Sequence, residues 1–269
     1  SPFTGASDEL VSVSADAVVA IVTPRALNIR NTPTSRPHEL ALDVSGGVDG
    51  EAGELLGAFQ ATDQLFTSAT PSGVFAATSF VGPVSSHGNY VAVVLAGVLG
   101  TSAARGVAVL DVRSSVTAVG IVSSTVPSYG EAVTLSSDDG GVLLAVGVPT
   151  VCVQGAAAGS SATRYGASCT TQPVAGAQAV SLYRVNGTGV FAIANVHPVD
   201  GAMAADSTFG AALAASGRFV VLGDANAGQR LGQVSVYAMD AAGTRAEALC
   251  AIPGVVPGGG LGYSVAVVA

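Results

Sequence analysis

The feature that most constrains this chain is a repeat that recurs along its length. The clearest copy begins at Phe209, with the sequence FGAALAASGRFVVLGDANAGQRLGQVSVYAMD. Similar runs begin at Tyr129 (YGEAVTLSSDDGGVLLAVGVP), at Phe80 (FVGPVSSHGNYVAVVLAG) and, more weakly, at Ser7. A truncated copy, LGYSVAVVA, begins at Leu261. Self-similarity of this kind indicates a repeat architecture in which each copy is one supersecondary unit.

Each copy shows the same order of patterns. An alternating apolar and polar stretch leads to a tight turn, such as Ser216-Gly217 or His87-Gly88. A nearly all-apolar stretch follows, as in residues 142–148, and a loop rich in Gly, Ser and Ala then leads to two further strand-like stretches. Alternation is typical of a strand with one buried face, and a short apolar run is typical of a strand buried on both faces. Each copy therefore predicts four antiparallel strands.

We predict an all-β fold, a β-propeller of four-stranded antiparallel blades, because such units repeated around an axis form that architecture. The expected single domain, residues 1–269, has four complete repeats plus one extra strand. The repeats span residues 7–79, 80–128, 129–208 and 209–260, followed by the partial copy 261–269. The extra length of the first and third copies is expected in surface loops, at residues 25–37, 63–79 and 150–176, since loop length varies at little cost.

The partial copy raises the question of how its strand is paired, because a lone strand exposes unpaired backbone groups. Three interpretations stay open. The chain is a fragment of a larger propeller, or the strand closes the ring against the first repeat, or the strand is donated to a neighbouring molecule in a head-to-tail filament.

Composition narrows the classes of partner. Only 10% of the residues are charged and the net charge is −8. The ten basic residues are all Arg and are scattered singly, so no basic stripe is available for phosphates and we expect no nucleic-acid partner. The apolar runs are far shorter than the roughly 18 residues of a membrane helix, so we expect no membrane span.

We also predict no catalytic residues, no cofactor and no metal. His38, His87 and His197 fall in separate repeats. No Ser has the context of a nucleophile elbow, and the Cys residues lack the close spacing of metal ligands. Carboxylates that converge from different blades would still allow an enzyme acting on polysaccharide.

The three Cys residues indicate a disulfide. Cys152 and Cys169 flank a loop rich in Gly, Ala and Ser, and we predict that they pair, which would stabilise the fold by about 3 kcal/mol. Two free, half-buried thiols are the alternative. Cys250 lies in an apolar run and is expected in the core. A disulfide would imply an oxidising compartment.

Two segments are candidate glycosylation sites. Asn186-Gly187-Thr188 is a sequon, and its Asn-Gly pair between two strand patterns predicts an exposed hairpin turn, so we predict N-glycosylation at Asn186. A Pro/Thr/Ser segment offers O-linked sites at Thr32, Thr34 and Ser35. A plain turn and a plain surface loop are the alternatives.

Several motifs resemble the FG-GAP repeat family, the repeat type of integrin α-subunit propellers. An aromatic or apolar residue followed by Gly opens the copies at residues 129–130, 209–210 and 261–262. Residues 146–149 (VGVP) resemble the family's Val-Gly-Ala-Pro step, and residues 232–237 (GQVSVY) resemble its Gly-x-Val-Tyr-Val-Tyr strand. The resemblance implies a propeller and an extracellular role.

One departure from the family pattern concerns calcium. Many members carry an Asp-rich calcium loop between the first two strands, but here that connection is short. Asp138 and Asp139 are adjacent, which is typical of turn residues, and residues 224–228 (DANAG) follow the second strand without a third carboxylate. The chain resembles the short, calcium-free variant of the repeat.

These patterns predict a non-catalytic extracellular or cell-surface module for adhesion or structural assembly, glycosylated and self-associating into a filament. Its expected partner is a protein or glycan surface. The alternatives are a propeller enzyme acting on polysaccharide and a lectin-like binding protein. The lectin-like alternative would need aromatic pockets, for which six Tyr, eight Phe and no Trp offer few stacking platforms.

Overall fold

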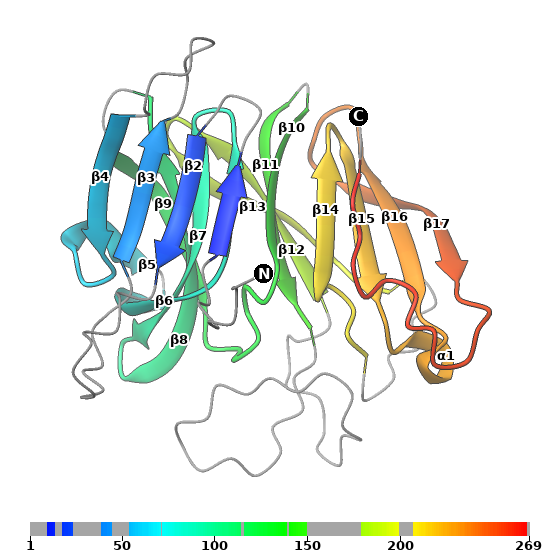
Figure 1. The fold of residues 1–269 in the computed structure, drawn as a ribbon. Coiled ribbons are helices and arrows are strands. Elements are labelled where there is room, and N and C mark those ends of the chain that lie inside the picture. Colours follow the sequence, from blue (N-terminus) through cyan, green and yellow to red (C-terminus); the bar gives the residue numbers. More distant parts are fainter. Residues whose placement is uncertain are drawn as a thin grey trace, which may run out of the picture. The chain divides into compact units, whose positions relative to one another are not determined.

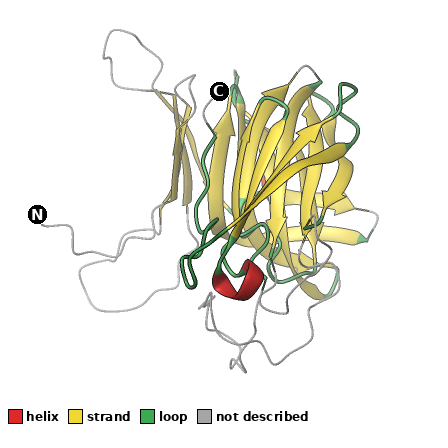
Figure 2. Cartoon of the chain, turned by 90° about the vertical axis from the view of Figure 1, so that its right-hand side faces the viewer, coloured by secondary structure: helices red, strands yellow, loops and turns green. Residues whose placement is uncertain are grey.

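The described part of the chain is built from strands. The structure, a computed structural model, describes residues 10–13, 18–23, 39–44, 54–70, 72–113, 116–138, 140–149, 179–198 and 207–267. For Gln229 and for those of the described residues that precede residue 59, it describes the backbone alone. Within these ranges the helices are short, η1 (Gln64–Phe66) and α1 (Ala227–Arg230), and all other regular elements are strands of antiparallel sheets (Figures 1 and 2). The predicted all-β fold is confirmed.

Three of the sheets have four strands that pair in chain order. The first contains β1 (Leu10–Val13), β2 (Val18–Thr23), β3 (Glu39–Val44) and β4 (Glu54–Gln60). Another contains β10 (Val133–Asp138), β11 (Gly141–Val148), β12 (Ala179–Asn186) and β13 (Gly189–Val196). The last contains β14 (Ala212–Ser216), β15 (Phe219–Asp224), β16 (Gln233–Met239) and β17 (Ala246–Pro253). A four-stranded antiparallel meander is the topology of a propeller blade, as the repeat predicts.

The remaining sheet has five strands, which corrects one expectation. Its strands are β5 (Thr67–Thr70), β6 (Gly73–His87), β7 (Tyr90–Leu99), β8 (Ser102–Asp111) and β9 (Thr117–Ser124). Residues 63–79, predicted as a surface loop, instead form η1, β5 and the first half of β6, so this sheet begins before Phe80. The reason is alternation along β6. The side chains of Phe75 and Ala77 are buried, whereas the side chain of Val74, which points to the other face of the sheet, is exposed.

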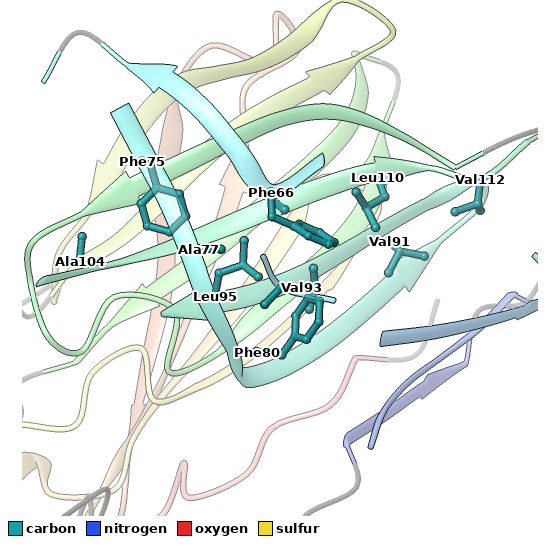
Figure 3. Packing of buried hydrophobic residues seen from close by; sticks show 12 residues of the cluster. Phe66, Phe75, Ala77, Phe80, Val91, Val93, Leu95, Ala104, Leu110 and Val112 are labelled. Atoms are coloured by element: carbon teal, nitrogen blue, oxygen red, sulfur yellow. The ribbon is translucent and has the colours of Figure 1, made fainter. Parts of the chain in front are cut away.

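Aromatic side chains form the centre of the core of this five-stranded sheet (Figure 3). Phe66 and Phe80 meet edge to face, with ring centroids 5.2 Å apart and an interplanar angle of 90°. Phe75, Leu95 and Leu110 extend the same cluster and are fully buried. The three Phe residues thus hold η1 and both halves of β6 against β7 and β8.

A bulge recurs at one position of the four-stranded sheets and supports their equivalence as structural repeats. The pairing of the third strand with the fourth shifts register once in each sheet. The shifts lie at Leu42/Asp43, Leu182/Tyr183 and Val236/Tyr237. Because a bulge increases the local twist, the fourth strand of each sheet turns away in the same manner.

The chain divides into two compact units, Ser1–Ser123 and Ser124–Ala269. In the second unit, sheet β10–β13 packs face to face on sheet β14–β17. The contact is made by Leu143, Ala145, Val180, Leu182 and Val196 on one side and by Phe209, Val220, Leu222, Tyr237 and Met239 on the other. A single propeller domain over residues 1–269 stays a prediction.

Two glycines let these two sheets approach each other. A Cβ on Gly147 of β11 would overlap the carbonyl oxygen of Gly210, which opens the next repeat. Gly210 itself has φ +83°, a conformation that residues with a Cβ rarely adopt. The Gly147 N–H donates to the Ala132 carbonyl (2.8 Å), and its own carbonyl accepts from Gly130 (2.9 Å). The backbone of Gly147 therefore contacts the backbone of Gly210 where the third repeat meets the fourth.

We expect Gly147→Ala to lower the free energy of unfolding by about 1–3 kcal/mol, the usual cost of overpacking a close contact. Gly187→Ala is the matched control, because a Cβ at Gly187 would have no neighbour within 4 Å. Urea unfolding followed by circular dichroism measures both. Equal midpoints for the two variants would contradict the importance of the glycine contact.

Candidate functional site

One face of sheet β14–β17 is apolar and only partly covered. Strand pairing places Val221 opposite Val236 and Val236 opposite Cys250, while Val234 lies opposite Ile252. Their neighbours along each strand, including Val220, Leu222, Tyr237 and Met239, point to the core shared with sheet β10–β13. We call the other face the open face and define it by Phe219, Val221, Val234, Val236, Cys250 and Ile252.

The exposure of these side chains shows that the open face is only partly covered. Ile252 is 52% exposed and Phe219 is 39% exposed. Val221, Val234 and Val236 are half-buried, and Cys250 is an exposed free thiol. By contrast, residues on both faces of β11 are buried. The chain therefore leaves a sheet face of Val, Ile and Phe in contact with solvent.

The same positions form an interface one sheet earlier. When Gly223 is aligned with Gly147, Phe219 and Val221 correspond to Leu143 and Ala145. The positions of Val234, Val236 and Ile252 correspond to those of Val180, Leu182 and Val196. All five counterparts are buried, and they make the contact with sheet β14–β17. The open face is thus the equivalent of a surface that, in sheet β10–β13, is covered by the next sheet.

The segment after β17 begins to repeat this covering. A Cβ on Gly223 would overlap the carbonyl oxygen of Gly262, just as a Cβ on Gly147 would overlap that of Gly210. Gly262 therefore lies on the end of β15, beside the open face (Figure 1). Its neighbour Leu261 is 39% exposed, whereas Phe209, at the same motif position, is 2% exposed. The opening pair is in place, but its apolar residue is not enclosed.

The predicted extra strand at residues 261–269 is absent from the described part, residues 261–267. Leu261 makes one isolated parallel bridge with Gly232, and its N–H donates to the Leu231 carbonyl (3.2 Å). Val265 and Val267 are half-buried, whereas Ser264 and Ala266 are exposed, so the burial still alternates. The segment has the pattern of a strand without a partner strand to form a ladder.

A buried carboxylate fixes the turn next to this segment. Asp224, at the end of β15, accepts hydrogen bonds from the Ser207 hydroxyl (2.6 Å) and from the N–H (2.8 Å) and hydroxyl (3.0 Å) of Thr208. The N–H of Asn226 donates to it as well (3.2 Å). The DANAG loop that superficially resembled a calcium site thus uses its first Asp to hold the start of its own repeat. Within the described ranges, no group of three or more His, Cys, Asp or Glu side chains is placed to hold a metal.

A pocket of about 320 Å³ lies beside Gly262. It is lined by Thr208, Ala211, Ala225, Asn226, Arg230, Gly258, Gly260, Gly262 and Tyr263. Arg230 ends α1 with φ +67°, an uncommon conformation for a residue with a side chain. An aromatic ring, a guanidinium and an amide around a small pocket could hold a polar molecule of the size of a saccharide.

Arg184 of β12 forms an ion pair within its own sheet and a hydrogen bond to the neighbouring sheet of the second unit. The Arg184 guanidinium binds the carboxylate of Asp138 and donates to the carbonyl of Gly243 (3.1 Å) in the turn after β16. Asp138 also accepts from the N–H of Gly140 (2.8 Å), which is the turn role that the sequence predicts. Asp139 lies outside the described residues. This clamp keeps β16 and β17, and so the open face, in a fixed position.

A tyrosine pair, of which Tyr129 is buried and Tyr183 is half-buried, lies at the start of the third repeat. The hydroxyls of Tyr129 and Tyr183 are 2.8 Å apart. At the position equivalent to Tyr183, Tyr237 donates to the carbonyl of His197 (2.6 Å). Burial, with the adjacent Tyr183, raises the pKa of Tyr129 well above its usual value of about 10.

This shift predicts a loss of stability at high pH. The folded state favours the protonated Tyr129, so its contribution is complete below about pH 10 and is lost progressively above that pH, where the unfolded chain ionises. We expect urea midpoints to fall between about pH 10 and pH 11, and to fall less in Tyr129→Phe. Identical pH profiles for the two proteins would contradict this assignment.

The structure places only some of the predicted site residues. Asn186 is exposed at the tip of the β12–β13 hairpin, as predicted, and its side-chain oxygen accepts from the N–H (2.9 Å) and hydroxyl (2.6 Å) of Thr188. Its glycosylation stays a prediction. Outside the described residues lie Cys152, Cys169, Thr32, Thr34 and Ser35.

Cys250 corrects an expectation. The sequence placed it in the core, but it is exposed, because it belongs to the last strand of its sheet and points to the open face. The open face itself was not predicted from the sequence. The signal in the sequence was the alternation of Val234 and Val236 on one face of their strand. Whether these side chains are buried depends on a covering sheet, which the sequence alone does not identify.

The described residues contain no helix long and apolar enough to cross a membrane. No protein-family model matches the chain, and no curated protein matches it. It is similar in structure to a protein from Lactobacillus plantarum, with a TM-score of 0.43 and 14% sequence identity. The similarity covers 93% of this chain but 56% of that protein, so the chain spans little more than half of that protein's length. No property of that protein is carried over to this chain.

Proposed function

We propose that this chain is a non-catalytic propeller-type module that acts outside the cell or at its surface, in adhesion or structural assembly. The proposal rests on the open face, because the equivalent face of sheet β10–β13 packs against another sheet. In this proposal the module works by burying the open face against another protein surface.

The physical reason is the chemistry of the face. Its six defining side chains are Phe, Val, Ile and Cys, and none of them is an Asp, Glu, Lys or Arg. Burying such side chains is favourable by roughly 25 cal/mol per Å² of apolar surface. Contiguous apolar patches on proteins commonly mark interaction sites. Contact with another apolar surface is therefore more favourable for this face than contact with water.

The glycine contacts support an assignment of the repeats to the FG-GAP type. Gly147 and Gly210 belong to the two motifs on which that resemblance rests, and they meet where one sheet packs on the next. Gly223 and Gly262 repeat the contact one sheet later. A repeat of that type implies adhesion or assembly.

Location outside the cell is supported by the sequon and by the predicted disulfide. Asn186 lies at an exposed hairpin tip, where a glycan meets no steric obstacle from its neighbour Gly187. The Cys152–Cys169 pairing would require an oxidising compartment.

Adhesion is tested with beads coated with the full chain and mixed with cells of the source organism or with one another. We expect coated beads to adhere to at least one of these. Ile252→Glu places a charge on the open face and should reduce adhesion by about tenfold or more, because a buried unpaired charge weakens an interface strongly.

The matched control is Phe191→Ser, since Phe191 is 50% exposed on β13 and lies outside the open face. Beads carrying this variant should adhere like the wild type. Absence of adhesion to both targets would overturn the proposed function, and equal loss in both variants would remove the role of the open face.

The extracellular location is tested by the intact mass of natively isolated protein. We expect a mass that falls after deglycosylation. In the same host, Asn186→Gln should lack the N-linked part of this difference, whereas Gly187→Ala keeps the sequon and should retain it. An unmodified mass in native material would contradict the location.

A further inference from the structure

We infer that Asn186, at the tip of the β12–β13 hairpin, is a site of spontaneous deamidation, at which the side-chain amide is lost as ammonia and a carboxylate takes its place. The juxtaposition behind it is the amide of Asn186 beside the backbone of Gly187 and the two donors of Thr188. The inference goes beyond the proposed function. It concerns chains whose Asn186 carries no glycan, because a glycan would occupy the same Nδ2 atom.

The reaction needs only water and hydroxide, because its nucleophile is the backbone nitrogen of the next residue. Hydroxide removes the proton of the Gly187 N–H, and the nitrogen then attacks Cγ of Asn186. An N–Cγ bond forms, the Cγ–Nδ2 bond breaks, and Nδ2 takes a proton from water and leaves as ammonia. Water opens the resulting succinimide. Opening at Cγ gives aspartate, and opening at the backbone carbonyl gives isoaspartate.

The hydrogen bonds of Thr188 hold the amide in place for this attack. Oδ1 of Asn186 accepts from the N–H (2.9 Å) and from the hydroxyl (2.6 Å) of Thr188. The bond from the N–H closes a ring of atoms that includes both reacting atoms, Cγ of Asn186 and the nitrogen of Gly187. Negative charge develops on Oδ1 during the attack, and donors aimed at such an oxygen stabilise it. Thr188 therefore positions the amide and lowers the barrier.

The turn is open at Gly187. Asn186, Gly187 and Thr188 are all exposed, so water and hydroxide reach the Gly187 N–H. Among the described residues, no acceptor lies within hydrogen-bond distance of this N–H. A Cβ at Gly187 would have no neighbour within 4 Å, so no other part of the described chain obstructs ring closure. Glycine also allows the backbone rearrangement that ring closure requires.

The other asparagines lack this combination. Each of them is followed by a residue with a side chain, and Asn186 alone precedes a Gly. Asn89 is also exposed in a hairpin turn, but Tyr90 follows it. Asn195 lies within β13, and the buried Val196 follows it. Asn89 is therefore the natural internal reference for Asn186.

The repeat indicates that the aspartate product fits the turn. The equivalent positions of two other sheets carry Asp: Asp111 ends β8 and Asp240 follows β16, each before the last strand of its sheet. Each carboxylate accepts a backbone N–H of its own turn, at 3.1 Å for Asp111 and 2.8 Å for Asp240. An aspartate at position 186 can accept the N–H of Thr188 in the same way.

The isoaspartate product does not have this equivalence. It routes the backbone through Cβ and Cγ of residue 186, and so lengthens the connection between β12 and β13 by one carbon. Asn186 pairs with Gly189 where the two strands meet, and the longer backbone disturbs that pair. The two products of one reaction therefore differ in their effect on the hairpin.

The experiment follows the full chain, expressed in bacteria that lack N-glycosylation so that Asn186 starts unmodified, and incubated folded at physiological pH and temperature. Peptide mapping by mass spectrometry measures the replacement of NH2 by OH at each asparagine, and chromatography separates aspartate from isoaspartate. We expect Asn186 to convert at least about tenfold faster than Asn89, because Gly follows the first and Tyr follows the second.

Four variants test the residues of the turn separately. Gly187→Ala should slow conversion by about tenfold, because a Cβ restricts the backbone during ring closure. Thr188→Val loses the hydroxyl donor and keeps the N–H, and should slow conversion about threefold or more. Thr188→Ser retains the hydroxyl and is the matched control, with the wild-type rate. Asn186→Asp should unfold at the wild-type urea midpoint, because Asp occupies the equivalent positions of two other sheets.

Conversion in urea without conversion in the folded chain would overturn the inference, because the folded turn would then protect the amide. Equal rates at Asn186 and Asn89 would overturn it as well, and so would equal rates in the wild type, Gly187→Ala and Thr188→Val. None of these outcomes affects the proposed function, which is tested by bead adhesion and by the mass of native material.

Discussion

The contact between Gly147 and Gly210 is the constraint on which the rest of the second unit depends. A side chain at Gly147 would collide with the backbone of Gly210, so the two sheets can pack closely only because both residues lack a Cβ. That close approach encloses Leu143, Leu182 and the facing residues in one core. The clamp made by Arg184 then acts on sheets that the glycines have already brought together. The same contact recurs at the open face, because Gly223 and Gly262 repeat it beside a sheet on which Ile252 is 52% exposed.

Much of this arrangement could be predicted from the sequence, because it depends on local patterns. The turns at His87-Gly88, Ser216-Gly217 and Asn186-Gly187 were predicted correctly. Each connects its two strands directly, and so short a connection fits only a few turn conformations, for which Gly is typical. The four-strand units followed from alternation. Residues 63–79 were misassigned because their alternation is short and follows a long variable region, so the pattern resembled a loop.

The site was less predictable, because exposure depends on contacts between sheets. Val234 and Val180 have the same local sequence context, yet Val180 is fully buried and Val234 is half-buried. Cys250 was misplaced for that reason: its apolar neighbours indicate a strand but do not identify which face of that strand is covered. The role of Asp224 could not be read from its spacing either, because its donors Ser207 and Thr208 precede it by a whole hairpin.

In the second unit, the glycine contact links one repeat to the next along the chain, and this locality has an evolutionary consequence. A repeat that carries both glycines brings its own means of attachment, one residue for the preceding sheet and one for the following sheet. Duplication or loss of a whole repeat would therefore leave the remaining contacts chemically unchanged. We therefore expect complete repeats to be gained or lost more readily than either glycine is replaced.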